Sequence, residues 1–250
     1  MELPAGELVL EGHRSIEAAL EARARPVHRI WAVRPGDRRF RRLRALAREA
    51  GAVIDQVEPE RVDEVTSGRT HGGIVAIVGP RRTVTVHQLL AGVGERALLV
   101  MLDGIEDPFN FGQAVRALYA AGVDGLVVRR DWESAVTTVT RASAGASELM
   151  PTATAATAHE AAEACRAAGM RVIVADGADD AIPVDHADLR GGVVVLIGGE
   201  RRGVTRSIVD EADVRIRIAY GRARAPDLGA ASAAAVIGFA ALRQRREMAS

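Results

Sequence analysis

Three segments in the second half of the chain carry residue types that could bind a ligand or assist a transfer reaction. Each follows or ends an apolar run: Leu102–Arg116, Leu196–Val204 and Ile216–Ala230. In an open parallel sheet, ligands bind beyond the carboxyl ends of the strands. The three segments are therefore predicted to lie at that edge of one sheet.

The first segment is predicted as the end of a strand, a loop rich in Pro, Gly and Asn, and the start of a helix. Asn110 fits the N-cap of that helix. Arg116 lies one to two turns further on, and we expect it to point back toward the strand ends because helical side chains lean toward the N-terminus. An exposed arginine on an ordinary strand–turn–helix unit gives the same pattern.

The second and third segments offer glycines and acids. Gly198 and Gly199 follow a buried strand, and glycines there let a ligand approach the backbone closely. Glu200 could fix a chain turn or receive a polar ligand group. The spacing fits neither a phosphate loop nor a dinucleotide fingerprint. Asp227 precedes a long C-terminal helix, where an acid can serve as a cap or act on a ligand.

Strands and helices alternate around these segments. In the first half we predict strands at 8–12, 29–33, 53–57 and 73–78 and helices at 14–24, 38–50 and 60–65. In the second half we predict strands at 97–103, 125–128, 171–176, 193–197 and 214–218 and helices at 111–121, 158–168 and 229–246. Continuous apolar strands indicate a parallel sheet covered on both faces. The prediction is an α/β protein with a small domain over 1–85 and a larger one over 93–250.

Composition excludes several classes of protein. The 250 residues are 48% hydrophobic, which is enough for a folded core. Aromatic residues are only 3%, which disfavours an extended base-stacking platform. A single cysteine, Cys165, and histidines without ligand spacing predict no disulfide and no metal site. Without an uncharged apolar run of membrane-spanning length or a signal-peptide pattern, we expect a cytoplasmic protein that does not enter membranes.

Charge is balanced overall but not along the chain. The 33 basic residues, all arginines, equal the 33 acidic ones, which excludes a polybasic protein held on nucleic acid by bulk charge. Up to Thr85 there are 15 arginines and 12 acids, and six of these arginines lie between Arg38 and Arg48. This predicted helix presents either a solvated face or a surface that contacts phosphates.

Several stretches also stand in a recognisable order: Asp107–Gly112 with Arg116, then Arg141–Glu148, then Ile197–Gly203. They resemble the first motif, the Ser-Ala-Gly-Ala segment and the Gly-x-Glu-x-x-Gly motif of the SpoU/TrmH branch of the SPOUT superfamily, the α/β-knot RNA methyltransferases. The ending at 241–245 resembles that family's C-terminal helix.

The first half has its own resemblance. Glu11-Gly12 followed by a predicted helix, and His71–Ala76, resemble the ribosomal-protein-L30e-like substrate-binding domain that often precedes the methyltransferase domain. The two resemblances together cover nearly the whole chain.

The resemblance implies an S-adenosylmethionine-dependent methyltransferase, a trefoil knot, a homodimer and an rRNA or tRNA substrate. It makes Asn110 and Arg116 catalytic candidates, and Asp227 is a third candidate because of its own chemistry. Arginine stays protonated, so Arg116 is assigned to orienting the acceptor or a phosphate. The expected cofactor-binding residues are Leu196, Ile197, Gly198, Gly199, Glu200, Gly203, Ile218, Tyr220, Pro226, Leu228 and Ala230. The expected substrate-binding residues are Arg38, Arg41, Arg42, His71 and Ser143.

The third motif departs from the family pattern. Where the family usually reads Ser-Leu-Asn-Val-Ser, this chain reads Ala225-Pro226-Asp227-Leu228-Gly229. A carboxylate suits proton removal from a ring nitrogen better than from a ribose hydroxyl, so Asp227 is hypothesised to serve a nucleophile other than ribose. Under that hypothesis Asp227→Asn abolishes turnover and leaves cofactor affinity nearly intact.

Three functions therefore stay open. The first is methylation of RNA, at a ribose 2′ oxygen or at a base nitrogen. The second is methylation of a small molecule or another non-RNA acceptor, which the altered third motif and the neutral overall charge favour. The third is an inactive RNA-binding or ribosome-associated protein.

Overall fold

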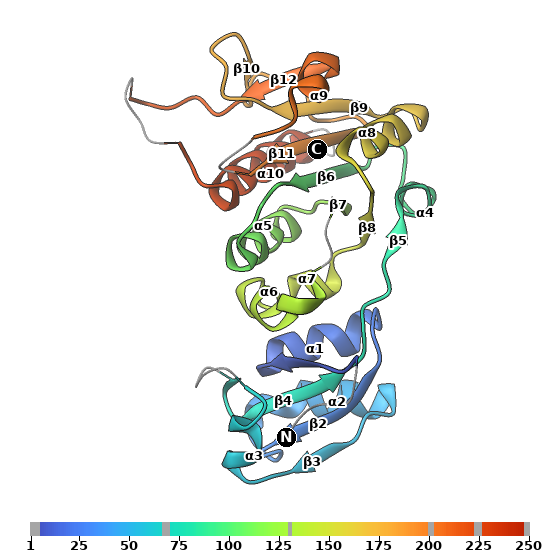
Figure 1. Cartoon of the computed structure of the whole chain (residues 1–250), viewed down its shortest axis with the longest axis vertical. Coiled ribbons are helices and arrows are strands. Elements are labelled where there is room, and N and C mark those ends of the chain that lie inside the picture. Colours follow the sequence, from blue (N-terminus) through green and yellow to red (C-terminus); the bar gives the residue numbers. More distant parts are fainter. Residues whose placement is uncertain (1–5, 67–70, 130–131, 200–202, 223–226, 248–250) are drawn as a thin grey trace. The chain divides into compact units, whose positions relative to one another are not determined.

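A computed structural model describes residues 6–66, 71–129, 132–199, 203–222 and 227–247. The chain divides into two compact units (Figure 1). Unit 1 comprises residues 1–82 together with 132–149, and unit 2 comprises residues 83–131 and 150–250. The sequence alone grouped residues 132–149 with the second domain, whereas in the structure they pack within unit 1.

Unit 1 is built on a four-stranded sheet with the order β1-β4-β2-β3, in which only β2 and β3 pair in parallel. Alternate residues of a strand face opposite sides. Ile74, Ala76 and Val78 of β4 therefore pack with α1 and α2, while Val75 and Ile77 join the opposite cluster with α3. The strands are β1 (Leu8–Glu11), β2 (Val27–Ala32), β3 (Ile54–Gln56) and β4 (Ile74–Val78), and the helices are α1 (His13–Ala22), α2 (Arg41–Ala50) and α3 (Pro59–Asp63).

The arginine-rich helix begins later than the sequence predicts. A short 3₁₀ turn, Arg38–Phe40, precedes α2. Phe40 is buried within this turn and packs against the same face of the sheet as α2. Gly51 ends the helix in the left-handed conformation, at φ 68°, which agrees with the predicted end of this helix at residue 50.

Residues 132–149 contribute a 3₁₀ turn (Glu133–Ala135) and the helices α6 (Val136–Ala142) and α7 (Ala146–Leu149) to unit 1. Charged and polar contacts hold them there. Arg25 Nε donates to Glu148 Oε2 at 2.9 Å, and both side chains are buried. Arg141 Nη1 donates to Glu11 Oε2 at 3.0 Å, and Thr137 Oγ1 donates to the Val9 carbonyl at 2.7 Å.

Unit 2 contains an eight-stranded sheet with the order β10-β12-β9-β11-β6-β7-β8-β5, and every neighbouring pair is parallel. This confirms the predicted α/β class and its parallel sheet. The strands are β5 (Val84–Thr85), β6 (Leu98–Asp103), β7 (Gly125–Val128), β8 (Thr152–Thr154), β9 (Arg171–Ala175), β10 (Ile182–Pro183), β11 (Val193–Gly198) and β12 (Val214–Arg217).

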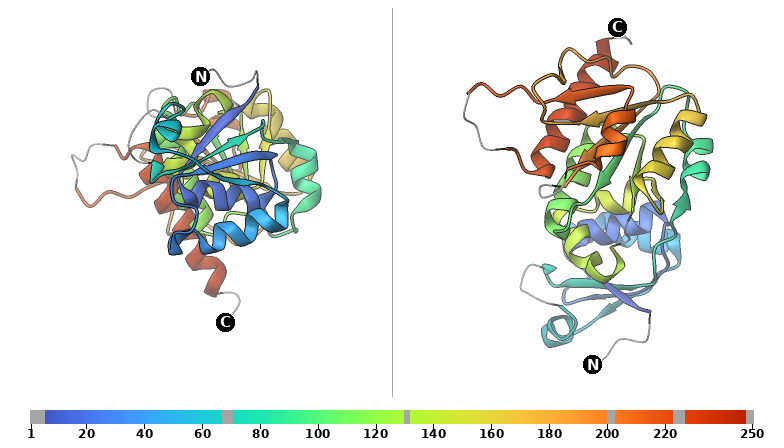
Figure 2. Two further views of the ribbon diagram at one scale, coloured as in Figure 1. Left: turned by 90° about the horizontal axis from the view of Figure 1, so that it is seen from below. Right: turned by 45° about the horizontal axis from the view of Figure 1, so that its top comes forward.

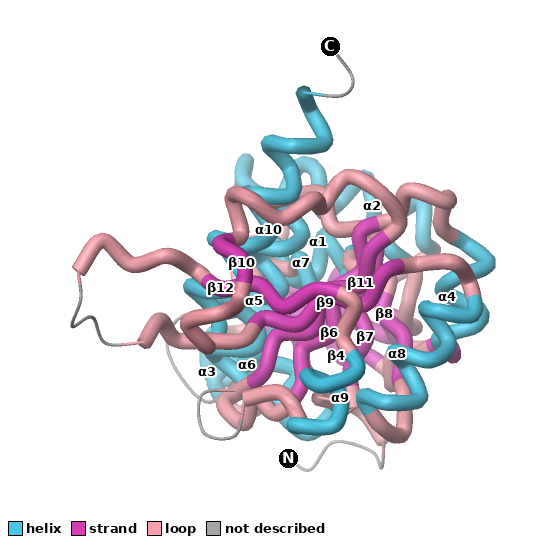
Figure 3. The backbone as a smooth tube through the Cα atoms, turned by 90° about the horizontal axis from the view of Figure 1, so that it is seen from above, coloured by secondary structure: helices cyan, strands magenta, loops and turns pink. Residues whose placement is uncertain are grey.

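Helices cover both faces of this sheet (Figure 3). On one face α4, α8 and α9 pack with alternate residues of the strands, around the fully buried Cys165. On the other, α5 and α10 pack closely, and a Cβ added at Gly238 would lie 3.0 Å from the Ala121 Cβ. The helices are α4 (Val86–Gly92), α5 (Pro108–Ala120), α8 (Ala158–Ala167), α9 (Arg206–Glu211) and α10 (Ala230–Glu247).

The start of α5 differs from the prediction. The helix begins at Pro108, and the N-cap is Asp107, whose Oδ1 accepts from the Asn110 N–H at 2.7 Å. The expectation that Asn110 caps the helix is therefore wrong. Proline suits the first helical position, because its missing N–H has no partner there in any case. Asn110 lies inside the first turn, and its side chain is half-buried.

Figure 2 shows the course of the chain in each unit from two further directions. Within the described residues, no helix is both long enough and apolar enough to span a membrane. The same residues contain no group of three or more histidine, cysteine or acidic side chains arranged to hold a metal ion.

Candidate cofactor and acceptor site

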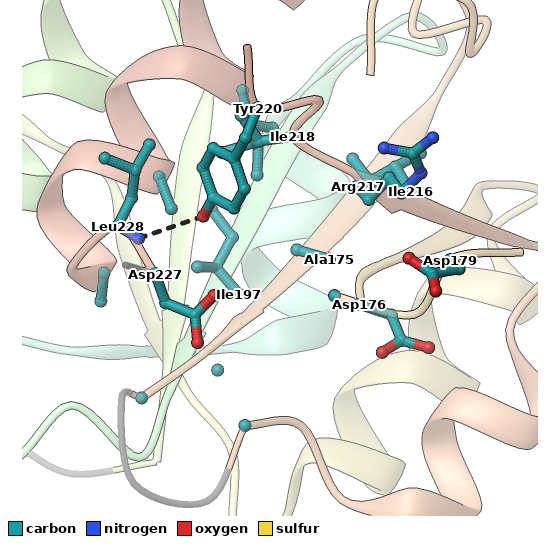
Figure 4. A pocket seen from close by; sticks show the side chains of 17 residues that line it. Ala175, Asp176, Asp179, Ile197, Ile216, Arg217, Ile218, Tyr220, Asp227 and Leu228 are labelled. Carbon is teal, nitrogen blue, oxygen red and sulfur yellow. Dashed lines mark hydrogen bonds between the residues drawn. The ribbon is translucent and has the colours of Figure 1, made fainter. Parts of the chain in front are cut away.

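A cavity of about 300 Å³ lies at the carboxyl edge of the parallel sheet in unit 2 (Figure 4). Three neighbouring strands end in it, β9, β11 and β12, and the start of α10 adds a fourth wall. This is the edge at which the sequence predicts a ligand. The residues lining the cavity are Ala175, Asp176, Gly177, Asp179, Ile197, Gly198, Gly199, Gly203, Ile216, Arg217, Ile218, Tyr220, Asp227, Leu228, Ala230, Ala233 and Ile237.

At the end of β11, neighbouring backbone leaves no space for a side chain at Gly198 or Gly199. A Cβ at Gly199 would lie 2.0 Å from the Gly104 carbonyl oxygen, and one at Gly198 would lie 2.2 Å from the Gly203 carbonyl carbon. The Gly199 N–H donates to the Asp103 carbonyl at 2.7 Å, and the Gly203 N–H donates to the Gly199 carbonyl at 2.9 Å. Neighbouring backbone therefore fills the side of each glycine on which a Cβ would lie, while both glycines also line the cavity.

The cavity is lined by both apolar and acidic side chains. Ile197, Ile218 and Leu228 provide apolar surface, and Tyr220 Oη accepts the Leu228 N–H at 3.1 Å. The Asp227 carboxylate points into the cavity from the α10 side, opposite the end of β9 (Figure 4). An apolar lining with a few placed polar groups is typical of sites for small organic ligands.

The cavity brings together eight of the eleven residues that the sequence predicts to bind the cofactor: Ile197, Gly198, Gly199, Gly203, Ile218, Tyr220, Leu228 and Ala230. Leu196 is fully buried in the core beneath the cavity. Glu200 and Pro226 lie outside the described residues. Sequence reasoning missed the end of β9, Ala175–Asp179. The available signal was a third apolar strand, predicted at 171–176, that ends in Asp176-Gly177.

The three catalytic candidates are not equivalent in position. Asp227 lines the cavity and is exposed to solvent. Asn110 and Arg116 lie on α5 and are not among the lining residues. The Arg116 side chain is exposed. The expected meeting of Asn110 and Arg116 with the strand ends is therefore not visible in the cavity itself.

A second, more polar cavity of about 610 Å³ adjoins the first and shares Ala175–Gly177 and Gly203 with it. The Asp103 carboxylate is buried here at the end of β6 and accepts from Arg129 Nη1 at 3.0 Å. Glu106 and Thr205 also line it. Two adjoining cavities, one partly apolar and one polar, give space for two reactants at one edge of the sheet.

The predicted substrate-binding residues of unit 1 fall into two groups. His71, Ser143 and Arg42 make contacts inside the unit. His71 Nδ1 accepts the Gly73 N–H at 3.1 Å while Nε2 faces Asp63 Oδ1 at 3.1 Å, so Nε2 carries the proton. Ser143 is buried against Thr140 and Ser147.

The arginines of α2 and its preceding turn differ in the same way. Arg42 pairs with Glu21 at 2.7 Å. Arg44 donates to the Pro35 and Asp37 carbonyls. Arg38 and Arg41 are exposed, and the structure gives them no partner among the described residues. Of the three arginines predicted to bind substrate, Arg38 and Arg41 are thus the two available to an external ligand.

Comparison with known proteins follows the same division of the chain. Residues 97–239 match the model of the SpoU rRNA Methylase family. The chain belongs to this family. Residues 9–84 match a model described as RNA 2′-O ribose methyltransferase substrate binding. The predicted family is therefore confirmed, with its substrate-binding domain in front.

Individual relatives agree. The 23S rRNA (guanosine-2′-O-)-methyltransferase RlmB of Pseudomonas syringae is 30% identical over 239 residues, which cover 94% of each chain. An uncharacterized tRNA/rRNA methyltransferase of Synechocystis, slr0955, is 30% identical over 243 residues, and the chain spans 62% of its length. Among solved structures, the SpoU methyltransferase AviRb of Streptomyces viridochromogenes in complex with AdoMet has a TM-score of 0.79 and 26% identity, covering 97% of this chain and 91% of that one. For this SpoU family member, the expectation of an S-adenosylmethionine-dependent methyltransferase is confirmed at the level of the family.

Proposed function

We propose that the protein transfers the methyl group of S-adenosylmethionine to a ribose 2′ oxygen of an rRNA or tRNA. The observation that carries this proposal is the cavity at the ends of β9, β11 and β12, which the family's second and third motif positions line. Its volume of about 300 Å³ and its apolar lining suit an adenosine. Its carboxylates suit the hydroxyl and ammonium groups of the same cofactor. The described residues therefore fit S-adenosylmethionine.

In this reaction the protein has to position the acceptor more than to activate the methyl group. The bound cofactor would supply a methyl group on a sulfonium, which is already activated. The protein then has to hold the acceptor oxygen in line and receive its proton. Arg116 orients the acceptor or its neighbouring phosphate through its guanidinium in this proposal, and Asn110 lies in the first turn of the same helix. The polar cavity with Asp103 and Arg129 is the proposed place for a polar part of the acceptor.

An RNA acceptor is supported by unit 1. Residues 9–84 match a substrate-binding model, and the exposed guanidinium groups of Arg38 and Arg41 suit RNA phosphates. RlmB of Pseudomonas syringae acts on a guanosine of 23S rRNA, and we infer the same class of acceptor here.

We also infer a homodimer and a trefoil knot. Support for the dimer comes from large apolar side chains on the outer faces of α5 and α10: Tyr119, Val236 and Phe239 are 41%, 38% and 48% exposed. Support for the knot comes from the end of β11, which packs against the backbone at both Gly104 and Gly203 without space for a Cβ. Sedimentation of the wild-type protein and of Phe239→Glu tests the dimer, and a wild-type monomer would contradict it.

A base nitrogen is the second candidate acceptor. The observation that favours it is the Asp227 carboxylate inside the cavity, where the family usually places an asparagine. A carboxylate can accept the proton of a ring N–H, whereas the usual amide cannot.

One experiment separates these acceptors. The protein is incubated with methyl-labelled S-adenosylmethionine and total RNA from cells that lack the gene, and the RNA is digested to nucleosides. We expect label in one 2′-O-methylated nucleoside and its loss in the Arg116→Ala variant. RNA from wild-type cells, already methylated, is the control and should take up little label. Label in a base would replace the ribose proposal, and no label with intact cofactor binding would indicate a non-RNA acceptor.

A further inference from the structure

The cavity in unit 2 carries more negative than positive charge. Asp176, Asp179 and Asp227 line it, and the one cationic residue among the described lining residues is Arg217. Arg217 directs its Nε to the Ala181 carbonyl at 3.1 Å and lies across the cavity from Asp227 (Figure 4). Asp176 is compensated by Arg215, whose Nη1 lies 3.4 Å from its Oδ2.

Asp227 differs from the paired Asp176. Its carboxylate points into the cavity beside Ile197 and Leu228, and the described residues give it neither a hydrogen-bond partner nor an ion-pair partner. It also stands where the family's third motif usually has an asparagine. The described part of the protein thus gives two carboxylates of the cavity, Asp179 and Asp227, no neutralising partner, and Asp227 is the one beside the apolar Ile197 and Leu228.

Methyl transfer changes the charge of the molecule in that cavity. The bond between sulfur and the methyl carbon would break with its electron pair staying on sulfur, the methyl carbon would bond to the acceptor atom, and that atom would lose its proton. The sulfonium would thereby become a neutral thioether. S-adenosylmethionine and S-adenosylhomocysteine share the adenosine, the ammonium and the carboxylate, and differ by the methyl group and this one positive charge. A nearby carboxylate thus interacts more favourably with the substrate than with the product.

We propose that Asp227 is a specificity-determining residue that makes the site prefer S-adenosylmethionine over S-adenosylhomocysteine. The proposal rests on the function inferred above. It assigns Asp227 to the cofactor and not to proton removal from the acceptor. The same attraction also helps the product to leave, because the carboxylate loses its partner charge once the methyl group has been transferred.

The test is calorimetric binding of both cofactors to the full-length wild-type protein, to Asp227→Asn and to Asp227→Glu. For Asp227→Asn we expect the affinity for S-adenosylmethionine to fall about three- to tenfold, and that for S-adenosylhomocysteine to change by less than about twofold. Asp227→Glu keeps the charge and should restore most of the preference. Added salt should shrink the wild-type preference, since an exposed carboxylate is screened.

Glu95→Gln is the matched control. It also replaces a carboxylate by an amide, but Glu95 is exposed at the opposite, amino edge of the sheet, just before β6. It should leave both affinities unchanged. Steady-state kinetics supply the second readout: Asp227→Asn should raise the KM for S-adenosylmethionine more than it changes kcat, and should strengthen product inhibition relative to substrate.

Each other outcome overturns the inference. An equal loss for both molecules would mean that Asp227 contacts a group that substrate and product share. Unchanged affinities with a collapsed kcat would assign Asp227 to proton removal. Unchanged affinities and an unchanged kcat would leave Asp227 without a role in the site. If the wild-type protein binds neither molecule, the proposed function itself fails. That result concerns the wild-type protein and is therefore distinct from any effect of the variants.

Discussion

The two units bury polar groups very differently. Of the eight buried polar or charged side chains in the described part of the chain, seven lie in unit 1, and only Asp103 lies in unit 2. Unit 1 joins distant segments through buried ion pairs such as Arg25–Glu148, 123 residues apart. Unit 2 joins its strands through continuous apolar runs and through glycines at which two backbones touch.

This difference determines where each unit is vulnerable. Removing one partner of a buried ion pair leaves the other charge buried without compensation. Adding a methyl group where two backbones touch forces the segments apart. The Arg25–Glu148 pair of unit 1 and the Gly198–Gly199 contacts of unit 2 are one example of each kind, so substitutions can test the contrast one unit at a time.

The largest effect is expected for Gly199→Ala in unit 2. The new Cβ would lie 2.0 Å from the Gly104 carbonyl oxygen, and neither backbone segment can yield without breaking the Gly199–Asp103 hydrogen bond. We expect the free energy of unfolding to fall by about 4 kcal/mol or more, together with loss of S-adenosylmethionine binding. Urea titration and calorimetry measure the two effects. Gly94→Ala is the control, because a Cβ there meets nothing within 4 Å. Equal stability of the two variants would contradict the close packing described here.

In unit 1, Glu148→Gln should rank next. Arg25 and Glu148 have side chains 2% and 1% exposed, so the variant removes the buried carboxylate and leaves the guanidinium only the partly exposed Glu133, at 3.4 Å. We expect a loss of about 3 kcal/mol. The matched control is Arg42→Gln, which breaks the Arg42–Glu21 pair whose side chains are 64% and 47% exposed. That change should cost less than about 1 kcal/mol. If both variants melt at the same temperature, the buried pair does not hold residues 132–149 in unit 1.

The same contrast explains what the sequence could predict. Val193–Ile197 and Leu98–Leu102 are uninterrupted apolar runs, so these parallel strands of unit 2 could be located from the local sequence pattern alone. The short strands and helices Val84–Gly92, Val136–Leu149 and Thr152–Thr154 were not predicted, because their apolar residues are few and follow no clear period.

The position of the cavity was predictable for the same reason. The roles of individual residues were not, and the reason is different. Strand ends locate a ligand site in a parallel sheet, which placed Ile197, Ile218 and Leu228 correctly in one lining. Pairings over long separations, such as Arg25 with Glu148, leave no local pattern. Nor does a motif reveal which of its residues serve packing: Gly145 of the Ser-Ala-Gly-Ala segment adopts φ 89°, where a Cβ would lie 2.7 Å from the Ala18 Cβ.

A third prediction asks whether the two units open independently. Burial raises the pKa of the Cys165 thiol to about 11. Because the thiolate is the reactive form, alkylation at pH 8 should be slowed about a hundredfold or more relative to an exposed thiol, and should speed up as the pH rises toward 11. Mass spectrometry after timed exposure to iodoacetamide measures the rate. Gly199→Ala should accelerate the labelling, and Glu148→Gln should not. Acceleration by Glu148→Gln would show that opening of unit 1 also opens unit 2.

The smallest effect concerns the exposed arginines of unit 1. Arg41 has no partner in the described structure, whereas Arg42, its neighbour in the sequence, is paired with Glu21. If RNA phosphates contact this helix, Arg41→Gln should weaken RNA binding by about 1 kcal/mol and lower the slope of log affinity against log salt by about one. Arg42→Gln, which removes the same charge from the same helix, should change the slope less because its guanidinium already has a carboxylate partner. Filter binding over a salt series distinguishes the two. An equal decrease of the slope in both variants would mean that the helix contributes only bulk charge. A slope that stays at the wild-type value in both variants would indicate that RNA contacts another face of unit 1.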